Sequence, residues 1–432
     1  MYCQNYKFFK NFNLQIISIL VLILPITIVS GPFIPDLIIS FSSSLFLVYC
    51  FKKNNYQIFK ENLFYYFVVF YLILLISSFL SIDIYKSLKS VFFYFRFIIF
   101  SFLIYYIFVH SKNFVEKFFK LIFLFFVFLI IDAFIQFFYG SNLLGFHILN
   151  QNNYFRVTSV FGDDLKLGSY MARFFPFFIY SLIIINLKKL NFCKTPLIVC
   201  FITVILLSGE RTAFFLSILS LFYLALFLKE KYIKKHLFLS IAILVITTLI
   251  TFHLNKNLKS RIILQTHEQI FNEDRSEEQK PILEKNRKFM FFSYMHDQHY
   301  RTALKIFRDY PIFGSGPKTF RILCAKKEYS SGINSCTTHP HNTYIQLLSE
   351  SGVLSFFVII SIFLYFVIKS GNQFFFKKEF FVNNLQVCMT CCFLVNLWPL
   401  SPSGSFFNNW LSIIYFFPVG VYLFSKTNEK VL

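Results

Sequence analysis

The sequence predicts an all-α integral membrane protein with about twelve transmembrane helices and one large loop domain before the last three. Of the 432 residues, 56% are hydrophobic and only 15% are charged. That is too little charge for the surface of a soluble protein of this size. The apolar residues are also gathered in blocks, many of them close to the roughly 20 residues that a helix needs to cross a bilayer. Both observations indicate a chain threaded repeatedly through a membrane.

The apolar blocks divide the chain into three regions. They fall at 14–30, 34–51, 63–80, 91–109, 119–138, 168–186, 195–208, 212–228, 237–253, 352–368, 381–398 and 408–424. The first block has no small-residue cleavage site after it, so we expect a retained helix and not a signal peptide. We therefore expect transmembrane helices 1–9 in 1–253, a large loop in 254–351, and helices 10–12 with a tail in 352–432.

The lysines predict the orientation. With the N-terminus inside, most lysines outside the large loop fall in cytoplasmic segments, and the opposite short loops hold only Lys86, Lys89, Arg156, Lys166 and Arg211. This positive-inside pattern places both termini in the cytoplasm and 254–351 on the outer side. The net charge of +21 then reflects topology and attraction to anionic membrane lipids. A nucleic-acid partner is not expected, because the lysines are spread over many loops.

Two cysteines and a histidine pair are candidates for a covalent link and a metal site. Cys324 and Cys336 share the outer loop, where an oxidising compartment favours a disulfide over two free thiols. His296 and His299 can share a helix face, but the sequence offers no nearby Cys or third His to complete a metal site. We expect these two histidines to be solvated, and we expect no metal and no cofactor.

A short hinge between two predicted spans carries Arg211, in the segment 208–212 (Ser-Gly-Glu-Arg-Thr). The hinge is so short that Arg211 must lie close to membrane depth, where an unpaired guanidinium is expensive. It could pair with Glu210 or extend to the interface. Alternatively it could bind a lipid phosphate, since the planar guanidinium suits bidentate phosphate binding. The residues alone favour neither.

A basic stripe is predicted in the outer loop. Arg301, Lys305 and Arg308 lie at positions i, i+4 and i+7 of a short amphipathic helix that should end before Pro311. Such a stripe is most often a solvated face. A binding surface is the alternative.

The run 338–342 (Thr-His-Pro-His-Asn) closes the polar region just before the tenth block. Asn342 or Thr343 can cap a helix that should stop at Gly352. His341 would then lie beside the positive end of the helix dipole, which lowers its pKa and favours the neutral imidazole that a general base requires. A capping histidine bonded to the backbone would give the same pattern.

In this order, the motifs resemble those of the O-antigen ligase family, which includes related O-antigen polymerases. His341-Asn342 with Gly352 is similar to the family's H-N-x-x…G-x-x-G signature, with Ser355 in place of the last glycine. The hinge at 208–212 is similar to its S-R-T-A element, with Glu210 inserted.

Further likenesses extend the resemblance to roughly residues 130–400. Residues 301–316 are similar to the family's R-x(n)-P-hydrophobic-F/G-G-x-G segment, and 136–140 and 156–162 are similar to weaker family elements. The order, spacing and membrane side of these motifs make the combination specific, although each motif alone is loose.

The resemblance implies a membrane glycosyltransferase of the GT-C type in the bacterial inner membrane, with a periplasmic active site. Such enzymes take a glycan from undecaprenyl diphosphate, and the ligases transfer it to a sugar of the lipid A-core with inversion and without a metal. By position, Arg211, Arg301 and Arg308 would hold the diphosphate. His341 would take the acceptor proton, assisted by His339.

Supporting roles are implied for Asn342, which could orient the base, and for Glu210 beside Arg211. The sequence separates ligase from polymerase poorly, because both need a diphosphate site and a base; the histidine context favours the ligase. A lipid-linked oligosaccharide transporter is less favoured, since charged residues inside the helices and internal repeats would be expected of it. The acceptor is therefore a lipid A-core or another glycan.

Overall fold

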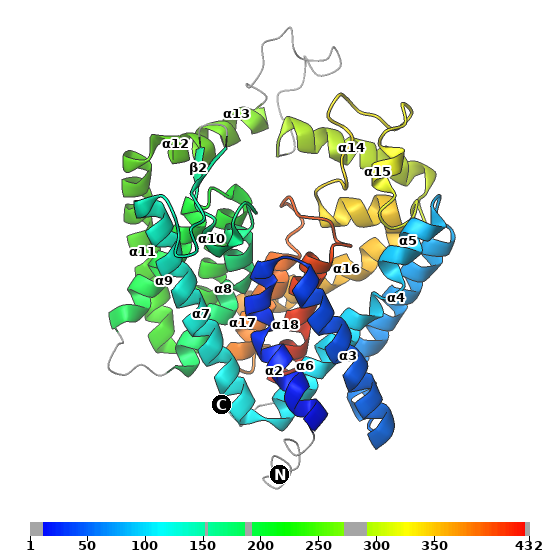
Figure 1. Ribbon diagram of the computed structural model, residues 1–432, viewed down its shortest axis with the longest axis horizontal. Helices are drawn as coiled ribbons and strands as arrows, with labels where there is room; N and C mark the ends of the chain where they lie inside the picture. Colours follow the sequence, from blue (N-terminus) through cyan, green and yellow to red (C-terminus); the bar gives the residue numbers. More distant parts are fainter. Residues whose placement is uncertain (1–11, 152–153, 186–191, 272–291, 428–432) are drawn as a thin grey trace.

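The computed structural model describes residues 12–151, 154–185, 192–271 and 292–427, and most of them are helical (Figure 1). The main helices are α2 (Phe12–Thr27), α3 (Phe33–Lys53), α4 (Asn62–Phe79), α5 (Ile84–Val91), α6 (Phe95–His110), α7 (Lys112–Tyr139), α8 (Leu167–Ile184), α9 (Lys194–Leu207), α10 (Arg211–Phe227), α11 (Lys231–Leu254), α14 (Tyr294–Asp309), α16 (Thr343–Phe376), α17 (Asn384–Asn396) and α18 (Asn409–Thr427). The shorter elements include η1 (Ile28–Ser30), η2 (Gln57–Lys60), η3 (Ser159–Phe161), α12 (Lys256–Lys259), η5 (Ser260–Leu264), α13 (Gln265–Phe271) and α15 (Phe320–Leu323), with one antiparallel pair of strands, β1 (Leu149–Gln151) and β2 (Tyr154–Arg156).

Each apolar block of the sequence coincides with a helix, so the prediction of an all-α membrane protein is confirmed. Within the described residues, eight helices are long and apolar enough to cross a membrane: α3, α4, the segment Ile84–His110, α7, α8, α11, α16 and α18. Four other apolar helices have 10–17 residues: Leu14–Ser30, α9, α10 and α17. The number of twelve crossings and the side on which 254–351 lies stay predictions.

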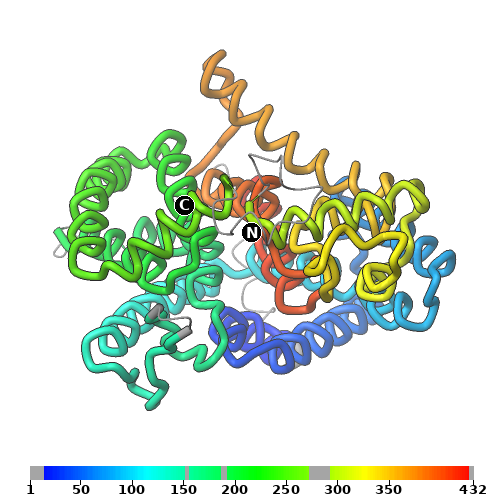
Figure 2. Tube along the Cα trace, turned by 90° about the horizontal axis from the view of Figure 1, so that it is seen from above, coloured from blue at the N-terminus to red at the C-terminus, as the bar shows by residue number. Residues whose placement is uncertain are grey.

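Short helices and loops cover one end of the bundle, which we call the cap end. It is formed by α12 to α15 and their loops (Figure 1). Helix α2 begins and α18 ends at the opposite end. Seen from the cap end, α17 and α18 lie centrally, with α8 to α13 to one side and α14, α15 and the start of α16 with α4 and α5 toward the other (Figure 2). The predicted boundary at 351/352 falls inside α16, which continues past a kink.

The central helices pack closely because small residues let their backbones approach. Gly420 of α18 lies against α6: a Cβ on this glycine would be 2.2 Å from the carbonyl oxygen of Ser101. The Ser101 hydroxyl in turn donates to the carbonyl oxygen of Phe416 at 2.8 Å. Phe97 stacks on Phe416 with ring centroids 5.9 Å apart. Small residues and interhelical hydrogen bonds are how helices associate where lipid gives no hydrophobic drive.

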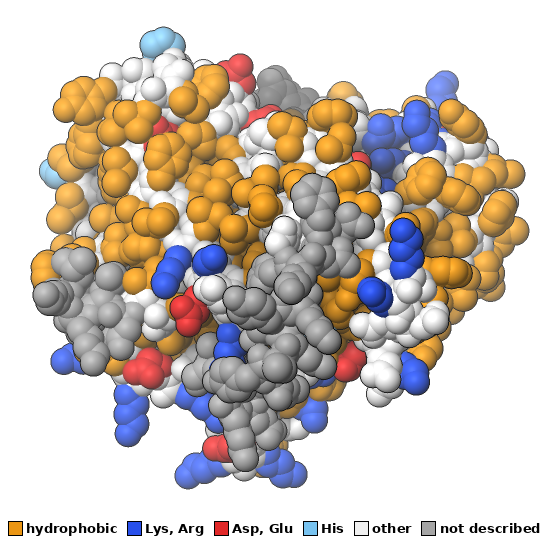
Figure 3. All heavy atoms as spheres, turned by 60° about the horizontal axis from the view of Figure 1, so that its bottom comes forward, with side chains coloured by type: hydrophobic (Ala, Val, Ile, Leu, Met, Phe, Trp, Pro, Cys, Tyr) orange, Lys and Arg blue, Asp and Glu red, His pale blue; other side chains and the backbone are white. Residues whose placement is uncertain are grey.

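The surface divides as expected for a membrane protein. Figure 3, which brings the end opposite the cap forward, shows a broad area of hydrophobic side chains with Lys and Arg side chains scattered around that end. Exposed apolar side chains such as Phe51, Leu249 and Phe357 belong to predicted spans and face outward. They would contact lipid, because outside a membrane they would be exposed to water at a cost.

The cap is fixed to α16 by direct backbone contact between the segment 311–316 and the segment 349–353. Ser315 and Gly316 donate their amides to the carbonyl oxygens of Ser349 (3.0 Å) and Glu350 (2.9 Å). Val353 donates to the carbonyl oxygen of Pro311 at 2.9 Å. These bonds interrupt α16 at Gly352, which has φ 75° and ψ 178°. The expected helix stop at Gly352 is thus a kink: the helix resumes because its remaining residues are an apolar span.

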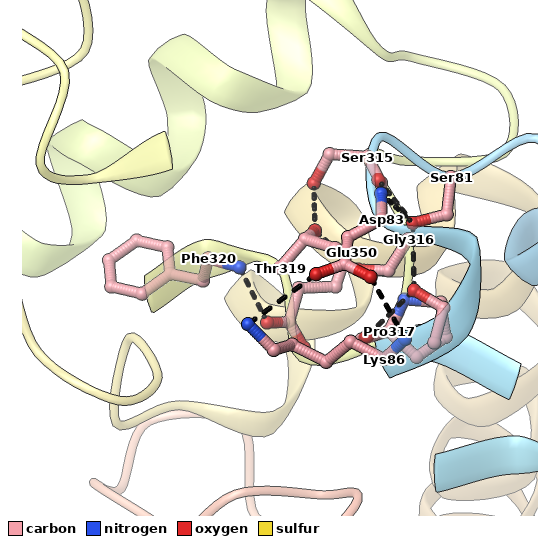
Figure 4. A network of polar contacts seen from close by, with 10 residues as sticks. Ser81, Asp83, Lys86, Ser315, Gly316, Pro317, Thr319, Phe320 and Glu350 are labelled. Atoms are coloured by element: carbon pink, nitrogen blue, oxygen red, sulfur yellow. Dashed lines mark hydrogen bonds and ion pairs between the residues drawn. The ribbon is translucent and has the colours of Figure 1, made fainter. Parts of the chain in front are cut away.

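Figure 4 shows how side chains complete this anchor. One carboxylate oxygen of the buried Glu350 accepts from the amide of Phe320 at 2.9 Å. Ser315 and Thr319 share a hydroxyl hydrogen bond of 2.7 Å, and the Ser81 hydroxyl, next to α5, donates to the carbonyl oxygen of Ser315 at 3.2 Å. The anchor therefore joins the cap, the start of α16 and the α4–α5 corner into one unit.

Candidate active site

The 338–342 run lies where α16 begins, and Asn342 holds it in place. The Asn342 carboxamide oxygen accepts from the amides of Tyr344 (3.0 Å) and Ile345 (3.1 Å), so Asn342 caps the helix. Its Nδ2 donates to the carbonyl oxygen of Pro399 at 2.8 Å, which ties the cap to the loop between α17 and α18. Asn342 therefore fixes the position of the neighbouring His341.

His341 adopts a backbone conformation that side-chain-bearing residues rarely take, with φ 58°. Its carbonyl oxygen accepts from the amide of Ser403 at 2.9 Å, on the α17–α18 loop. A residue other than glycine keeps a left-handed backbone conformation only where the surrounding structure stabilises it. Such residues are concentrated at functional sites. The bond to Ser403 and the adjacent cap by Asn342 supply that hold.

Three more imidazoles surround His341. Its ring centroid is 4.1 Å from that of His339, 5.3 Å from that of His299 and 5.7 Å from that of His296. Our expectation that His296 and His299 are solvated is wrong: His299 is only 8% exposed and His296 is half-buried. They share the face of α14 that packs against the start of α16, a pairing set by the anchor at 311–316.

Burial keeps this cluster uncharged at neutral pH. It lowers the pKa of His296 and of His299 to about 4, and that of His339 to about 3, with the neighbouring imidazoles adding to each shift. Burial also lowers the pKa of His341. The lowered pKa of His341 has the direction expected from the sequence, although desolvation and not the helix dipole is its main cause. A neutral imidazole is the form that accepts a proton.

A cavity of about 370 Å³ opens beside His339 and His341. Four arginines line its other side, from β2, α8, the start of α10 and η5. The lining residues are Arg156, Ser169, Ala172, Arg173, Gly209, Glu210, Arg211, Thr212, Ala213, Leu216, Arg261, His339, His341, Pro402, Ser403 and Gly404. The cavity thus brings the predicted Arg211 and Glu210 together with the predicted His339 and His341.

Each of the four arginines donates at least one hydrogen bond to a neutral oxygen atom. Arg156 donates its Nε to the carbonyl oxygen of Ser208, and Arg261 to that of Gly209, each at 2.9 Å. Arg211 donates to Thr266 Oγ1 at 3.1 Å and to Gln269 Oε1 at 2.9 Å, on α13. Arg173, which is buried, donates to Asn396 Oδ1 at 2.9 Å. These bonds orient the guanidinium groups, and the cavity lining itself is cationic, because it contains four arginines and one carboxylate.

Glu210 is the acidic residue within this arginine group. Its two carboxylate oxygens accept from the amides of Gly168 (2.8 Å) and Ser169 (3.0 Å), at the first turn of α8. Burial raises its pKa to about 7, and Arg156 together with these two amides opposes that rise. Glu210 therefore holds α8 against the hinge, and it offsets only part of the charge of four arginines. The cavity as a whole favours an anion.

Two predicted residues lie away from the cavity lining. Arg301 forms an ion pair with Asp297 of the same helix, α14. It is about 140° around the helix from His296 and about 200° from His299, so it leaves α14 on a different face. Arg308 is exposed near the end of that helix. The structure therefore groups Arg211 with the histidines and keeps the basic stripe of α14 apart from them.

The structure joins Cys324 and Cys336 in a disulfide, with their Cα atoms 4.8 Å apart. The bridge closes the loop that leads into the histidine run, and Arg321 Nη2 donates to the carbonyl oxygen of Thr338 at 3.3 Å. Both links limit how far the residues before His339 can move.

Several cavity residues were not recognised from the sequence. Arg173 lies inside an apolar block, and a charged residue within a span is a signal of function that could have been used. In the sequence, Arg156 stands out only as a basic residue of an outer loop and as part of a weak family element. Arg261 lies in a loop of mixed charge, and nothing in the sequence distinguishes it from its neighbours. For His296 and His299, the only indication of a joint role was that they could share a helix face.

Fold and site together define a multi-pass helical membrane protein with an electropositive cavity beside a cluster of neutral histidines. Residues 196–360 match the family model described as O-antigen ligase. This segment runs from α9 into α16 and includes Arg211, Arg301 and His341, so the match supports the predicted resemblance to the O-antigen ligase family over this part of the chain. The matched family suggests a membrane glycosyltransferase-like enzyme, and it implies a lipid-linked glycan and an acceptor as substrates in general terms. No curated protein matches the chain.

Proposed function

We propose that this protein is an O-antigen ligase that transfers a glycan from undecaprenyl diphosphate to a sugar of a lipid A-core. The observation that carries the proposal is the single cavity in which Arg211 and three further arginines face His339 and His341. A diphosphate leaving group needs cationic donors, and a sugar hydroxyl needs a base. The cavity has both within one space of about 370 Å³.

In the proposed reaction, the acceptor hydroxyl oxygen attacks the anomeric carbon of the glycan while the bond from that carbon to the diphosphate oxygen breaks. His341 takes the hydroxyl proton, and undecaprenyl diphosphate leaves with the bonding electron pair. Attack from the side opposite the leaving group inverts the anomeric centre. Arg211, with Arg156, Arg173 and Arg261, stabilises the charge that grows on the leaving diphosphate, and this cationic wall supports a metal-independent route.

Arg301 and Arg308 belong to the proposal in a conditional role. They are separated from the cavity lining in this structure, and Arg301 is paired with Asp297. They would contact the diphosphate only if α14 shifts or turns when the donor binds. His339 and Asn342 would orient His341, the first through ring contact and the second through the helix cap.

The proposed site faces the periplasm, at the outer side of the bacterial inner membrane, with both termini in the cytoplasm. The lysine distribution along the sequence supports this orientation. The Lys and Arg side chains around the end opposite the cap agree with it (Figure 3). The test is a membrane-impermeant thiol reagent applied to a single-cysteine variant, Glu328→Cys, in the cap. Labelling in intact spheroplasts is expected, and labelling only after permeabilisation would reverse the orientation.

The function is tested by His341→Ala in the native host, with His147→Ala as the control because His147 is exposed and outside the cavity lining. The ligase predicts full-length glycan on the lipid carrier together with undecorated lipid A-core. Core carrying a single repeat unit would instead identify an O-antigen polymerase, which the family also includes. Fully decorated glycolipid would overturn the catalytic assignment of His341.

A further inference from the structure

Lys318 is a cap residue to which the proposed function gives no role, and it lies in an unfavourable setting. Its backbone is left-handed, with φ 63°, although the residue carries a long side chain. The side chain is half-buried, and burial lowers the pKa of its ammonium group. A strained backbone and a desolvated charge both cost free energy. Their combination at one residue is typical of functional sites, which makes Lys318 a candidate for binding.

Other positive charges surround the Lys318 ammonium group. Arg321 in α15, Arg96 in α6 and Lys89 in α5 are each close enough to lower its pKa beyond the effect of burial. The buried Glu350 acts in the opposite direction, but it is one negative charge against three positive ones. The charges around Lys318 are therefore mostly of its own sign, and they repel it.

Three of these cations, Lys89, Lys318 and Arg321, form what we call the basic cluster. Within the part of the chain that the structure describes, none of the three forms an ion pair. By contrast, Arg96 is paired with Asp36 at 2.6 Å. Lys89 and Arg321 are exposed, so an anion can reach the cluster from outside. A phosphate group fits it, because a guanidinium binds two phosphate oxygens and ammonium groups add point charges.

The contact between the cap and α5 brings the basic cluster together. The Ser87 hydroxyl of α5 donates to the carbonyl oxygen of Pro317 at 3.0 Å. Pro317 directly follows the anchor segment 311–316 and lies beside the α4–α5 corner (Figure 4). Lys318 is the next residue after Pro317, and Lys89 lies two residues after Ser87. Two lysines from distant parts of the chain are therefore brought together by the packing of the cap.

The surroundings of the basic cluster indicate a membrane surface. Helix α5 continues into the apolar α6, and together they form one of the candidate spans, Ile84–His110. Tyr85, Phe92 and Phe93 are exposed on this segment. Aromatic side chains and lysines at the end of a span are typical of the membrane–water interface. We therefore expect the anion to belong to the head group of a membrane lipid.

Arg321 connects the basic cluster with the histidine run. Its Nη2 donates to the carbonyl oxygen of Thr338 at 3.3 Å, one residue before His339. Besides burial and the nearby His341, Arg321 also lowers the pKa of His339. None of the cluster residues lines the arginine cavity. The cluster approaches the histidines from the side of α5 and α15, and the arginines approach them from the side of α8 to α13 (Figure 2).

We propose that the basic cluster binds a phosphate group of the acceptor lipid. The proposal rests on the proposed function, in which the acceptor hydroxyl attacks from the side opposite the leaving diphosphate. With the diphosphate among the arginines of the cavity, that side is the one of α5 and α15. A lipid A-core carries phosphate groups on its sugars, and its acyl chains then lie beside the span 84–110. Two separate phosphate sites hold the two substrates on either side of the histidines.

The main variant is Lys318→Gly, studied as the full chain in nanodiscs of neutral phosphatidylcholine. Glycine accepts φ 63° without strain, so the thermal midpoint should be unchanged or higher although the cation is lost. The affinity for lipid A-core should fall by about tenfold, because a charge-assisted contact to phosphate is lost. Binding of undecaprenyl diphosphate should not change. Lys318→Arg should keep most of the affinity, and Lys327→Gln, at an exposed cap lysine outside the cluster, is the control.

The dependence on phosphate is tested with lipid A-core from which the phosphates have been removed. The wild-type protein should bind this lipid as weakly as Lys318→Gly binds the phosphorylated one, and the variant should lose nothing further. An equal loss by the variant on both lipids would overturn the proposal, because the side chain would then act without the phosphate. Phosphatidylglycerol or inorganic phosphate that competes as well as lipid A-core would make the cluster a general anion site and also overturn it.

This proposal and the proposed function fail in different ways. If the wild-type protein transfers glycan to lipid A-core and Lys318→Gly binds that lipid with unchanged affinity, the acceptor site is overturned and the ligase function stands. If the wild-type protein transfers glycan only to a second glycan on undecaprenyl diphosphate, the ligase function is overturned, and lipid A-core is no longer the ligand of the cluster.

Discussion

The histidine side and the arginine side of the candidate site hold their functional groups in different ways. On the histidine side, burial between α14 and the start of α16 keeps four imidazoles neutral. On the arginine side, carbonyl, hydroxyl and amide oxygens hold guanidinium groups that cannot lose their charge at neutral pH. One side is thus suited to accept a proton, and the other to bind an anion.

The two sides also differ in what fixes them. Arg156 and Arg211 are placed by a short strand and a hinge, Arg173 by the spanning helix α8, and Arg261 by η5, which follows α11 after one short helix. The histidines are placed by the contact of two backbone segments far apart in sequence, 311–316 and 349–353. The proton-accepting side therefore depends on tertiary packing more than the anion-binding side does, and it should be the easier of the two to disrupt from a distance.

The largest effect is expected for His341→Gln. Glutamine keeps the size and hydrogen bonding of the side chain but cannot take a proton, so transfer should fall by about 10²- to 10⁴-fold. Binding of undecaprenyl diphosphate should stay within about twofold, because the arginine side is unchanged. Turnover in purified protein and equilibrium binding of the carrier measure the two quantities. A variant that loses both equally would show that the two sides are not independent.

Gly314→Ala should displace the start of α16, and with it the histidine side, although Gly314 itself does not line the cavity. A Cβ at Gly314 would be 2.3 Å from the carbonyl carbon of Glu350, and its φ of 72° is already unfavourable for alanine. Backbone cannot move aside easily, so we expect a stability loss of about 3 kcal/mol or more and a matching fall in turnover.

Gly371→Ala is the matched control for this variant, since no atom lies within 4 Å of its added Cβ. It should be neutral or slightly stabilising, as expected for alanine in a helix. The thermal unfolding midpoint, measured in nanodiscs, reports both variants. An unaffected Gly314→Ala protein would contradict the anchoring of the cap on α16.

Arg211→Lys should lower kcat/KM for the donor by about tenfold, because an ammonium does not reproduce a bidentate guanidinium. Arg301→Lys should have a smaller effect unless α14 moves on donor binding. Lys120→Arg is the control, because Lys120 forms an exposed ion pair with Glu116 in the first turns of α7. A larger loss for Arg301→Lys than for Arg211→Lys would place the diphosphate on the α14 side and reverse the comparison.

The all-α membrane fold could be predicted from the sequence, and so could one residue on each side of the candidate site, Arg211 and His341. Block length and composition locate spanning helices because lipid requires every segment to satisfy its own backbone. Arg211 and His341 stand out because they are polar groups next to apolar blocks. His299 could not be placed in this way, since its environment depends on how α14 meets α16. Arg261 was equally hidden, because its role comes from the path of the segment 256–269.

The smallest effect, and the one that isolates the histidine side, is on the pH profile. Because burial lowers the pKa of His341 from its ordinary value of 6.5, the neutral base persists below pH 6.5. Turnover should therefore be nearly flat from about pH 8 to 6.5 and fall as the pH drops through the lowered pKa.

The same shifts affect folding stability in a definite direction. The folded-state pKa values of His296 and His299, about 4, are below the unfolded value, so their contribution is fully present above pH 6.5 and is lost as the pH falls toward 4. The thermal midpoint should fall over that interval, and His299→Gln should make the decline shallower by removing one titrating group. A profile of turnover that already falls between pH 8 and 7 would show that His341 is solvated, and the contrast between a neutral and a cationic side would then be lost.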